Sequence, residues 1–338
     1  MSNLITAPTD AIISRPAGSN LDIITTPDGT KRGVCNIVSL NPLSYKDENG
    51  IYRPNIDHYS FAIADYLAVK HLNGGDGSII KELNGLNETC NIQFGLEFID
   101  TEYDPTVAGN RVLRRLGLEN ESSKLEQHDS FEFNPCTFLE SADWSEVPAA
   151  TSYITGLQGY TEVASIITQD NLSHFPKFAR TVAASGGAAE AVVQYMSEKF
   201  NTKHLALLSV DNVDASSYAR EIRRANSVKD EMQIAEIILD RSWENIQAVV
   251  TELKELGFNT ILAILPDSTF TGNLTDSLME EAYKQGVAGK GTHTWIFTVF
   301  STHFGARKSY EKGSMLHSAY RGSGLIATGA VTGQKYDK

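Results

Sequence analysis

Cysteine is scarce in this sequence, with three in 338 residues, at Cys35, Cys90 and Cys136. That number is too small for a disulfide-rich scaffold, and no Cys-x2-Cys or His-x3-His spacing suggests a zinc site. Long apolar runs are also missing: none approaches the ~18–20 residues needed to cross a bilayer. The best candidate, residues 261–265, has the length of a strand.

Positive charge is in deficit as well. The chain carries 29 lysines and arginines against 42 aspartates and glutamates, so its formal net charge is −13. A chain this acidic repels phosphate groups, which argues against a nucleic-acid partner and against docking on an anionic membrane surface. We therefore expect no nucleic acid among its partners.

Several catalytic and cofactor-binding motifs are absent. No G-x-G-x-x-G follows the first expected strand, where the chain reads Leu40-Asn41-Pro42-Leu43-Ser44, and no G-x4-G-K-[ST] or G-x-S-x-G occurs. Dinucleotide, P-loop and serine-hydrolase sites are therefore not expected. The eight histidines are scattered, and the pair Asp211 and Asp214 is interpreted as a turn and a helix cap. We expect no cofactor, no metal and no catalysis.

From residue 33 onwards, short β-branched or apolar runs alternate with longer segments of helical period. Gly, Asp and Ser lie at the junctions, which predicts βαβ units: an α/β fold with parallel sheets flanked by helices. Two Rossmann-like units result, with a boundary near residues 178–187. The predicted strands cover residues 34–40, 92–99, 135–139, 162–167, 205–210, 233–239, 260–265 and 294–298.

Helix boundaries are predicted from capping residues. Asp104 followed by Pro105 is a strong start signal, and Gly74-Gly75 and Gly257 are expected to end helices. The helix before Gly74 is expected to bury an apolar face. Its members are Phe61, Ala64, Leu67, Ala68 and Leu72. Further starts are expected at Asp57, Ser145, Ser185, Asp214 and Ser242. Residues 1–32, rich in Thr, Pro, Ser, Asp and Gly, show no signal peptide and are expected to be mobile.

Several segments resemble a known family, the receptor family ligand-binding region. Residues 175–181, FPKFART, are similar to its YP-x-F-x-R-T segment, and residues 295–298, WIFT, to its W-I-x-T-D. Gly313-Ser314 and residues 319–324, AYRGSG, continue the resemblance in the same order. This is the type I periplasmic-binding-protein fold, found in natriuretic-peptide receptors, class C G-protein-coupled receptors and branched-chain amino-acid-binding proteins.

The resemblance implies two lobes that close on a small molecule and leave it chemically unchanged. Lobe 1 would comprise residues 33–180 and lobe 2 residues 181–300, with 301–338 crossing back toward lobe 1. Family members continue further, so we expect a fragment, incomplete at its C-terminus, of the extracellular region of a membrane receptor. The implied partners are a small ligand, a membrane-spanning signalling module in the full-length protein, and a second copy in a homodimer.

The same resemblance implies that residues following the strand ends hold the ligand. In amino-acid-binding members, hydroxyls and backbone N–H groups bind the carboxylate and an acid binds the ammonium group. Here Trp144 and two acids, Asp143 and Glu146, crowd the loop after the third strand, which suits a cationic ligand. The lobe-1 wall would include residues 41–44. The candidate ligand-binding residues are Ser44, Asp143, Trp144, Ser145, Thr168, Gln169, Asp214, Tyr218 and Asp267.

In the strand order of this fold, Cys35 lies on a central strand. It could approach either Cys90 or Cys136, whereas those two would be two strands apart, beyond disulfide reach. Two other functions stay open at this point. One is a free solute-binding protein of an amino-acid transport system; the other is an α/β enzyme, which would need a clustered nucleophile and base.

Overall fold

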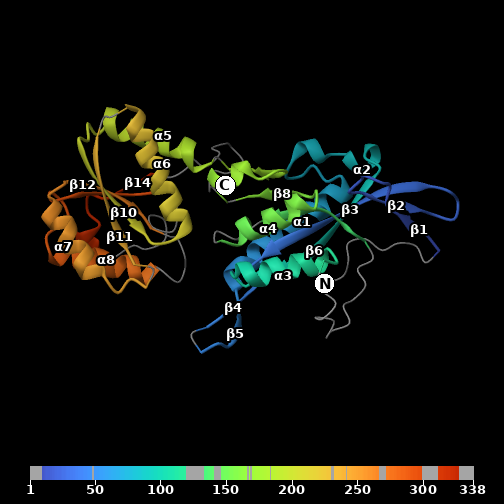
Figure 1. Ribbon diagram of the computed structural model, residues 1–338, viewed down its shortest axis with the longest axis horizontal. Coiled ribbons are helices and arrows are strands. Elements are labelled where there is room, and N and C mark those ends of the chain that lie inside the picture. Colours follow the sequence, from blue (N-terminus) through green and yellow to red (C-terminus); the bar gives the residue numbers. More distant parts are fainter. Residues whose placement is uncertain are drawn as a thin grey trace. The chain divides into compact units, whose positions relative to one another are not determined.

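The computed structural model describes residues 10–47, 49–118, 133–140, 146–165, 167, 170–182, 184–229, 232–240, 242–265, 272–298 and 311–326, without the side chains of residues 57, 170, 214, 272 and 273. The chain divides into two compact units, residues 1–183 and 184–338. Both are α/β, with helices packed on a sheet (Figure 1). The expected α/β class with two sheets is thereby confirmed.

The N-terminal unit is built on a seven-stranded sheet whose path runs β1-β2-β3-β7-β8-β9, with β6 pairing the other side of β3. The strands from β3 onward pair in parallel, and β1–β2–β3 pair antiparallel. A separate hairpin, β4–β5, follows β3. The bounds are β1 Ile12–Ser14, β2 Asp22–Thr25, β3 Lys31–Asn41, β4 Ser44–Lys46, β5 Tyr52–Pro54, β6 Ile92–Asp100, β7 Pro135–Glu140, β8 Thr161–Ala164 and β9 Phe178–Arg180.

Helices cover both faces of this sheet. Val38 and Leu40 of β3 pack with Val112 of α3 in one core cluster, whereas Ser39, which points to the opposite face, bonds Asp65 of α1. α3 and α4 pack against each other, so α1 covers one face and α3 with α4 the other. The helices are α1 Ile56–Gly74, η1 Lys81–Leu83, α2 Leu86–Thr89, α3 Pro105–Arg115, α4 Val147–Leu157 and η3 Asp170–His174.

Of the segment expected to be mobile, residues 1–9 lie outside the described residues, and residues 10–30 contain two strands. β1 and β2 form an antiparallel hairpin, and β2 pairs with the first four residues of β3. Arg15 attaches the hairpin to the unit: its Nε lies 2.8 Å from Asp22 Oδ1, and its Nη2 donates to the Pro135 carbonyl at 3.0 Å. Composition suggested disorder because it does not report such long-range partners.

The C-terminal unit has one all-parallel five-stranded sheet in the order β11-β10-β12-β13-β14. Alternate residues of β10 point to two cores: Leu205 and Leu207 pack with α5 and α6, and Ala206 and Leu208 with α7 and α8. The bounds are α5 Ser185–Glu198, β10 His204–Val210, α6 Val213–Lys229, β11 Gln233–Leu239, α7 Ile246–Leu256, β12 Thr260–Ile264, α8 Gly272–Lys284, β13 Thr294–Phe297, α9 Met315–Ala319 and β14 Gly324–Leu325.

Both predicted helix ends and one of the predicted helix starts are confirmed, whereas several other predicted starts are wrong. Asp104 caps α3 by accepting from Thr106 N and Val107 N at 2.7 and 3.1 Å, and Gly75 and Gly257 end their helices in the left-handed conformation. The predicted caps Asp57 and Asp214 lie inside helices that begin after Asn55 and Asn212. The caps expected at Ser185 and Ser242 are Ala184 and Asn245 instead.

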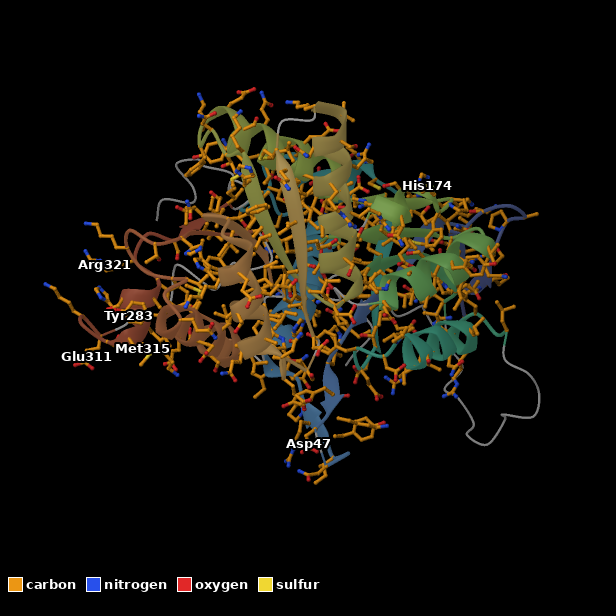
Figure 2. The ribbon with its side chains drawn as sticks, turned by 60° about the vertical axis from the view of Figure 1, so that its left-hand side comes forward. Asp47, His174, Tyr283, Glu311, Met315 and Arg321 are labelled. Carbon is orange, nitrogen blue, oxygen red and sulfur yellow. A yellow bond between two sulfur atoms is a disulfide. The ribbon has the colours of Figure 1, made fainter. Side chains whose placement is uncertain are left out.

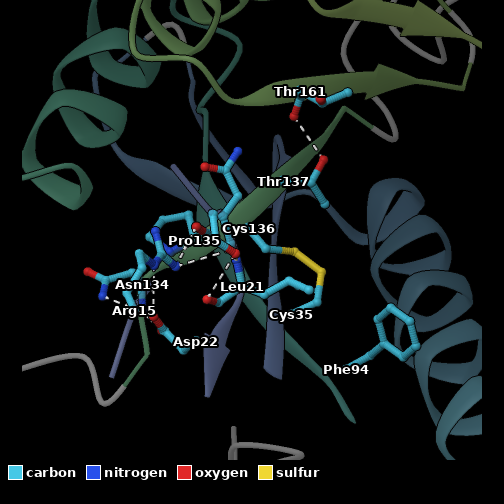
Figure 3. The surroundings of a disulfide bond; sticks show 12 residues. Arg15, Leu21, Asp22, Cys35, Phe94, Asn134, Pro135, Cys136, Thr137 and Thr161 are labelled. Atoms are coloured by element: carbon cyan, nitrogen blue, oxygen red, sulfur yellow. Dashed lines mark hydrogen bonds and ion pairs between the residues drawn. A yellow bond between two sulfur atoms is a disulfide. The ribbon is translucent and has the colours of Figure 1, made fainter. Parts of the chain in front are cut away.

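A disulfide joins Cys35 of β3 to Cys136 of β7, with the two Cα atoms 5.1 Å apart (Figure 3). This settles the alternative left open by the sequence, because β3 lies between β6 and β7 as expected. Cys90, just before β6, is a free thiol. The bridge closes a loop of 101 residues. Asp22, drawn in the same view, accepts a hydrogen bond from Asn134 N at 2.8 Å (Figure 3).

Candidate functional site

Most of the candidate ligand-binding side chains lie outside the described residues. These are Asp143, Trp144, Ser145, Thr168, Gln169 and Asp267, together with the side chain of Asp214. Ser44 and Tyr218 remain, one in each unit. The site is therefore built from what the structure places at the carboxyl ends of the strands, the edge where open α/β sheets bind ligands.

Ser44 uses its hydroxyl proton within the fold. Its Oγ donates to Asp100 Oδ2 at 2.5 Å, and its backbone N donates to Asp100 Oδ1 at 3.1 Å. Leu43 N and Glu102 N donate to the same oxygen at 2.9 and 3.1 Å. Asp100, the last residue of β6, thus fixes the loops after both β3 and β6, and only the lone pairs of Ser44 Oγ remain for a ligand.

Tyr218 lies in the core of the C-terminal unit. It is 2% exposed and packs in the α5–α6 cluster with Leu207 and Ile264. Burial raises its pKa to about 12, since a phenolate would have no water around it. In this conformation the ring supports α6 against the sheet.

Asn41, the last residue of β3, is the most informative residue at this edge. Its side chain is fully buried, and its Nδ2 donates to Ser39 Oγ at 2.6 Å and approaches Asp65 Oδ2 at 3.5 Å. Ser39 Oγ donates in turn to Asp65 Oδ2 at 2.6 Å. This chain fixes the amide orientation, so the Asn41 carbonyl Oδ1 points away from Asp65 and is buried without a hydrogen-bond partner.

A second buried carboxamide, that of Asn55, has its amide nitrogen and not its carbonyl oxygen without a hydrogen-bond partner. Asn55, directly before α1, is 4% exposed, and its Nδ2 has no hydrogen-bond partner. Its backbone N donates to the Leu43 carbonyl at 2.7 Å, which ties the start of α1 to the loop after β3. A buried polar group left unpaired costs about 1–3 kcal/mol. Such groups are expected where a ligand or an ordered water supplies the missing partner.

An acid lies at the end of the neighbouring strand, β7. Glu140 ends β7, is fully buried, and pairs in register with Leu40, the residue before Asn41. The chain crosses from one side of β3 to the other between β6 and β7, so β3 and β7 flank the switch point where α/β folds place ligands. Asn41 and Glu140 therefore occupy the two strand ends at that point.

The loop after β6 carries backbone strain at this edge. Glu102 and Tyr103 have φ of 54° and 57°, a left-handed conformation that costs non-glycine residues about 1–2 kcal/mol each. Arg111 holds the loop by contacting the Glu102 carboxylate and the Asp100 carbonyl. Tyr103 OH then hydrogen-bonds His58 Nε2 of α1. Strain of this kind concentrates at binding and catalytic sites.

A different buried acid lies at the amino end of β8. Glu162 is 1% exposed and accepts hydrogen bonds from three hydroxyls of α4, Ser152 at 2.7 Å, Thr155 at 3.0 Å and Thr151 at 3.1 Å. Burial raises its pKa to about 7, although the three hydroxyls act in the opposite direction. In strand register it lies level with Val38 of β3, and its three hydroxyl partners all come from α4, so it belongs to the packing of α4.

The sequence signals for these residues are weak. Asn41 falls within the stretch 41–44 expected to line the ligand, but Asn55, Asp65, Glu140 and Tyr103 were not singled out. An acid inside the apolar pattern of α1, as Asp65 is, was the available clue. In the described parts of the chain, no group of three or more His, Cys, Asp or Glu side chains is arranged to hold a metal ion.

Comparisons with known proteins do not assign the chain to a family. No protein-family model matches it, and a search of curated proteins finds no similar sequence. Among the helices that the structure describes, none is both long enough and apolar enough to span a bilayer.

Proposed function

We propose that this chain is the ligand-binding region of a membrane receptor and binds a small molecule at the carboxyl edge of the N-terminal sheet. The observation that carries the proposal is the Asn41 carbonyl, buried and without a hydrogen-bond partner at the end of the central strand. Because this carbonyl oxygen is a hydrogen-bond acceptor, its ligand must present an N–H or O–H donor there. An amino acid, a polyamine or a polyol meets that requirement.

Two further observations support recognition over catalysis. The polar side chains at this edge, Ser39, Asp65 and Asp100, are tied to one another or to backbone groups, as expected of a rigid binding surface. The histidine of the edge, His58, bonds a tyrosine hydroxyl. We further propose the type I periplasmic-binding-protein architecture for the pair of units, in line with the resemblance of residues 175–181 and 295–298.

An extracellular location is part of the proposal. Disulfides persist in oxidising compartments and are rare in the cytosol, and the Cys35–Cys136 bridge lies between two strands of the main sheet. The net charge of −13 also suits a ligand that carries positive charge, because the whole protein then attracts it.

A thermal-shift screen of amino acids, polyamines and small osmolytes tests the proposal. A ligand that binds only the folded state raises the melting temperature. Titration calorimetry on the best compound should then show that Asn41→Leu weakens binding by about tenfold or more, since a lost hydrogen bond leaves a polar ligand atom unpaired. The ligand should be recovered chemically unchanged, as judged by mass spectrometry.

Asn73→Ala is the matched control. Asn73 lies on α1 in the same unit, but its Nδ2 and Oδ1 both bond Phe94 backbone groups, at 2.7 and 2.8 Å. Its loss should lower stability and leave the dissociation constant unchanged. If Asn41→Leu binds the compound as tightly as the wild type does, the ligand lies elsewhere and the proposal fails.

A further inference from the structure

The start of α5, in the C-terminal unit, lacks the partners that a helix start usually has. The first N–H groups of any helix have no partner within it and are normally capped by a side chain. The N-cap of α5 is Ala184, which supplies no cap, and the first turn carries no acidic side chain. Among the described residues, nothing accepts a hydrogen bond from the backbone N–H of Ser185, Gly186 or Gly187.

The hydroxyl of Ser185 is a second unsatisfied group at this helix end. Ser185 is 2% exposed, and its Oγ has no hydrogen-bond partner. Side chains of helical residues tilt toward the helix N-terminus, so the hydroxyl of the first helical residue is directed to the same end as the free N–H groups. Buried polar groups are nearly always paired, and the missing partner is expected to be a bound group.

A third unsatisfied group follows the end of β13. Thr298 is fully buried, and its Oγ1 has no hydrogen-bond partner. Its backbone N donates to the Ala263 carbonyl at 3.2 Å, so the chain still follows β12 at this point. Side chains alternate between the two faces of a sheet. Thr298 therefore shares a face with Ile296, which packs in the core cluster of α5 and α6.

The start of α5 and Thr298 also share an edge of the sheet. The short segment 199–203 connects α5 to β10, so the helix runs antiparallel to that strand and begins at the carboxyl edge. α5 and α6 pack against each other on this face (Figure 1). Thr298 follows the carboxyl end of β13. The two buried hydroxyls and the free N–H groups are thus on one face, at one edge, of one unit.

We propose that the start of α5, together with Thr298, binds an oxyanion, which is a phosphate or carboxylate group. A helix start offers N–H donors and a partial positive charge, and the two hydroxyls can donate as well. Gly187 is exposed, and no atom lies within 4 Å of the position that a Cβ would take there, so the backbone is open to a ligand. A set of donors selects an acceptor and disfavours an ammonium group.

The site is compatible with the acidic character of the chain. The net charge of −13 repels anions at long range, but salt screens this repulsion beyond about 10 Å at 0.1 M ionic strength. Short-range hydrogen bonds then decide the binding. The inference is independent of the ligand proposed for the N-terminal unit, because that ligand must present a donor to Asn41 and this one must present acceptors.

Titration calorimetry of the whole chain with sodium phosphate, at an ionic strength held constant with sodium chloride, tests the proposal. One phosphate should bind in the millimolar range. Ser185→Ala and Thr298→Val should each weaken binding by about tenfold, because hydrogen bonds to a charged group are strong. Thr202→Val is the matched control. Thr202 is 5% exposed and its hydroxyl also has no partner, but it follows the other end of α5, where its N bonds the Met196 carbonyl.

A pair of variants at the exposed Gly187 keeps the test valid if a buried substitution prevents folding. Gly187→Asp places a carboxylate in the first turn, where it interacts favourably with the helix dipole. It should abolish phosphate binding and leave the chain folded. Gly187→Ala adds a methyl group alone and should leave the dissociation constant unchanged.

A further control separates this site from an exposed surface cation. Arg321 lies on the side of α8 and α9 in the same unit, together with Tyr283 and Met315 (Figure 2). Arg321→Ala should bind phosphate as the wild type does. If this variant loses phosphate and Gly187→Asp keeps it, the anion is held by the surface cation and the proposal is overturned.

Sodium acetate, titrated in the same way, identifies the kind of oxyanion. Tighter binding of phosphate assigns a phosphate group, and tighter binding of acetate assigns a carboxylate; either result supports the site. A wild type that binds neither probe in the millimolar range would overturn the proposal. The ligand of the N-terminal unit should bind Gly187→Asp as it binds the wild type, so the two proposals can fail separately.

Discussion

The carboxyl group of Glu162 shows how a single residue can make stability depend on pH. It is buried against α4 and accepts hydrogen bonds from three hydroxyl groups. Desolvation favours the protonated form, and the pKa rises from the ordinary 4.5 to about 7. Between pH 4.5 and about pH 7, the Glu162 carboxyl group is protonated in the folded chain and ionised in the unfolded chain.

We therefore predict that the N-terminal unit loses stability as the pH rises from 4.5 to 7. At about 1.4 kcal/mol per pH unit, the loss is on the order of 3.5 kcal/mol and is complete above the folded-state pKa. Glu162→Gln removes this contribution. Urea denaturation of the wild type and the variant at several pH values measures the difference.

Glu88→Gln serves as the control for that experiment, because Glu88 is exposed on α2. The difference in unfolding free energy between wild type and Glu162→Gln should change with pH, while that between wild type and Glu88→Gln should stay flat. A flat difference for Glu162→Gln would show that the carboxyl group is ionised or hydrated in the folded chain.

At the scale of elements, the end of α1 is set by one glycine of an adjacent pair. Gly75 has φ of 59° and donates its N–H to the Leu72 carbonyl at 3.3 Å, whereas Gly74 is the last helical residue and has open space around it. A Cβ at position 75 would also meet the side chain of Asn87. Only one of the two glycines is thus required by the backbone.

We expect Gly75→Ala to lower the unfolding free energy by about 1–2 kcal/mol, the cost of a left-handed conformation for a residue with a Cβ. Gly74→Ala should change it by less than about 0.5 kcal/mol, or raise it through better helix propensity. Chemical denaturation of the two variants is the measurement. Equal effects would mean that the helix ends differently in solution.

Element prediction worked where the signal is local. Asp104-Pro105 starts α3, and the strand expected at 233–239 is β11 without change. It failed where the answer depends on partners. Asp57 is a good cap by residue type, but α1 begins two residues earlier, because Asn55 N bonds the Leu43 carbonyl. The buried side of α1 was also misjudged, since leucine and alanine fit either face.

At the scale of the whole molecule, the Cys35–Cys136 bridge should stabilise one unit and not the other. It closes a loop of 101 residues within the N-terminal unit, and in the entropy model the restriction of the unfolded chain by a loop of that length stabilises the fold by about 4.7 kcal/mol. Cys35→Ser with Cys136→Ser should therefore lower the melting temperature of the N-terminal unit.

Differential scanning calorimetry checks this expectation, because the transition of the C-terminal unit should stay in place. Thiol titration of the unfolded, unreduced wild type should find one reactive group, Cys90. Three reactive groups in protein folded under oxidising conditions would show that the bridge does not form.

The sequence by itself determined the α/β class and the order of most strands and helices, because hydrophobic periodicity and turn residues act locally. Tertiary structure decided the rest. It joined the first hairpin to β3, paired Cys35 with Cys136, and turned Leu67 outward. It also brought Asn41, Asn55 and Glu140 to one edge of the sheet. Each of these depends on which distant segments meet, and that information lies in the packing of the whole chain.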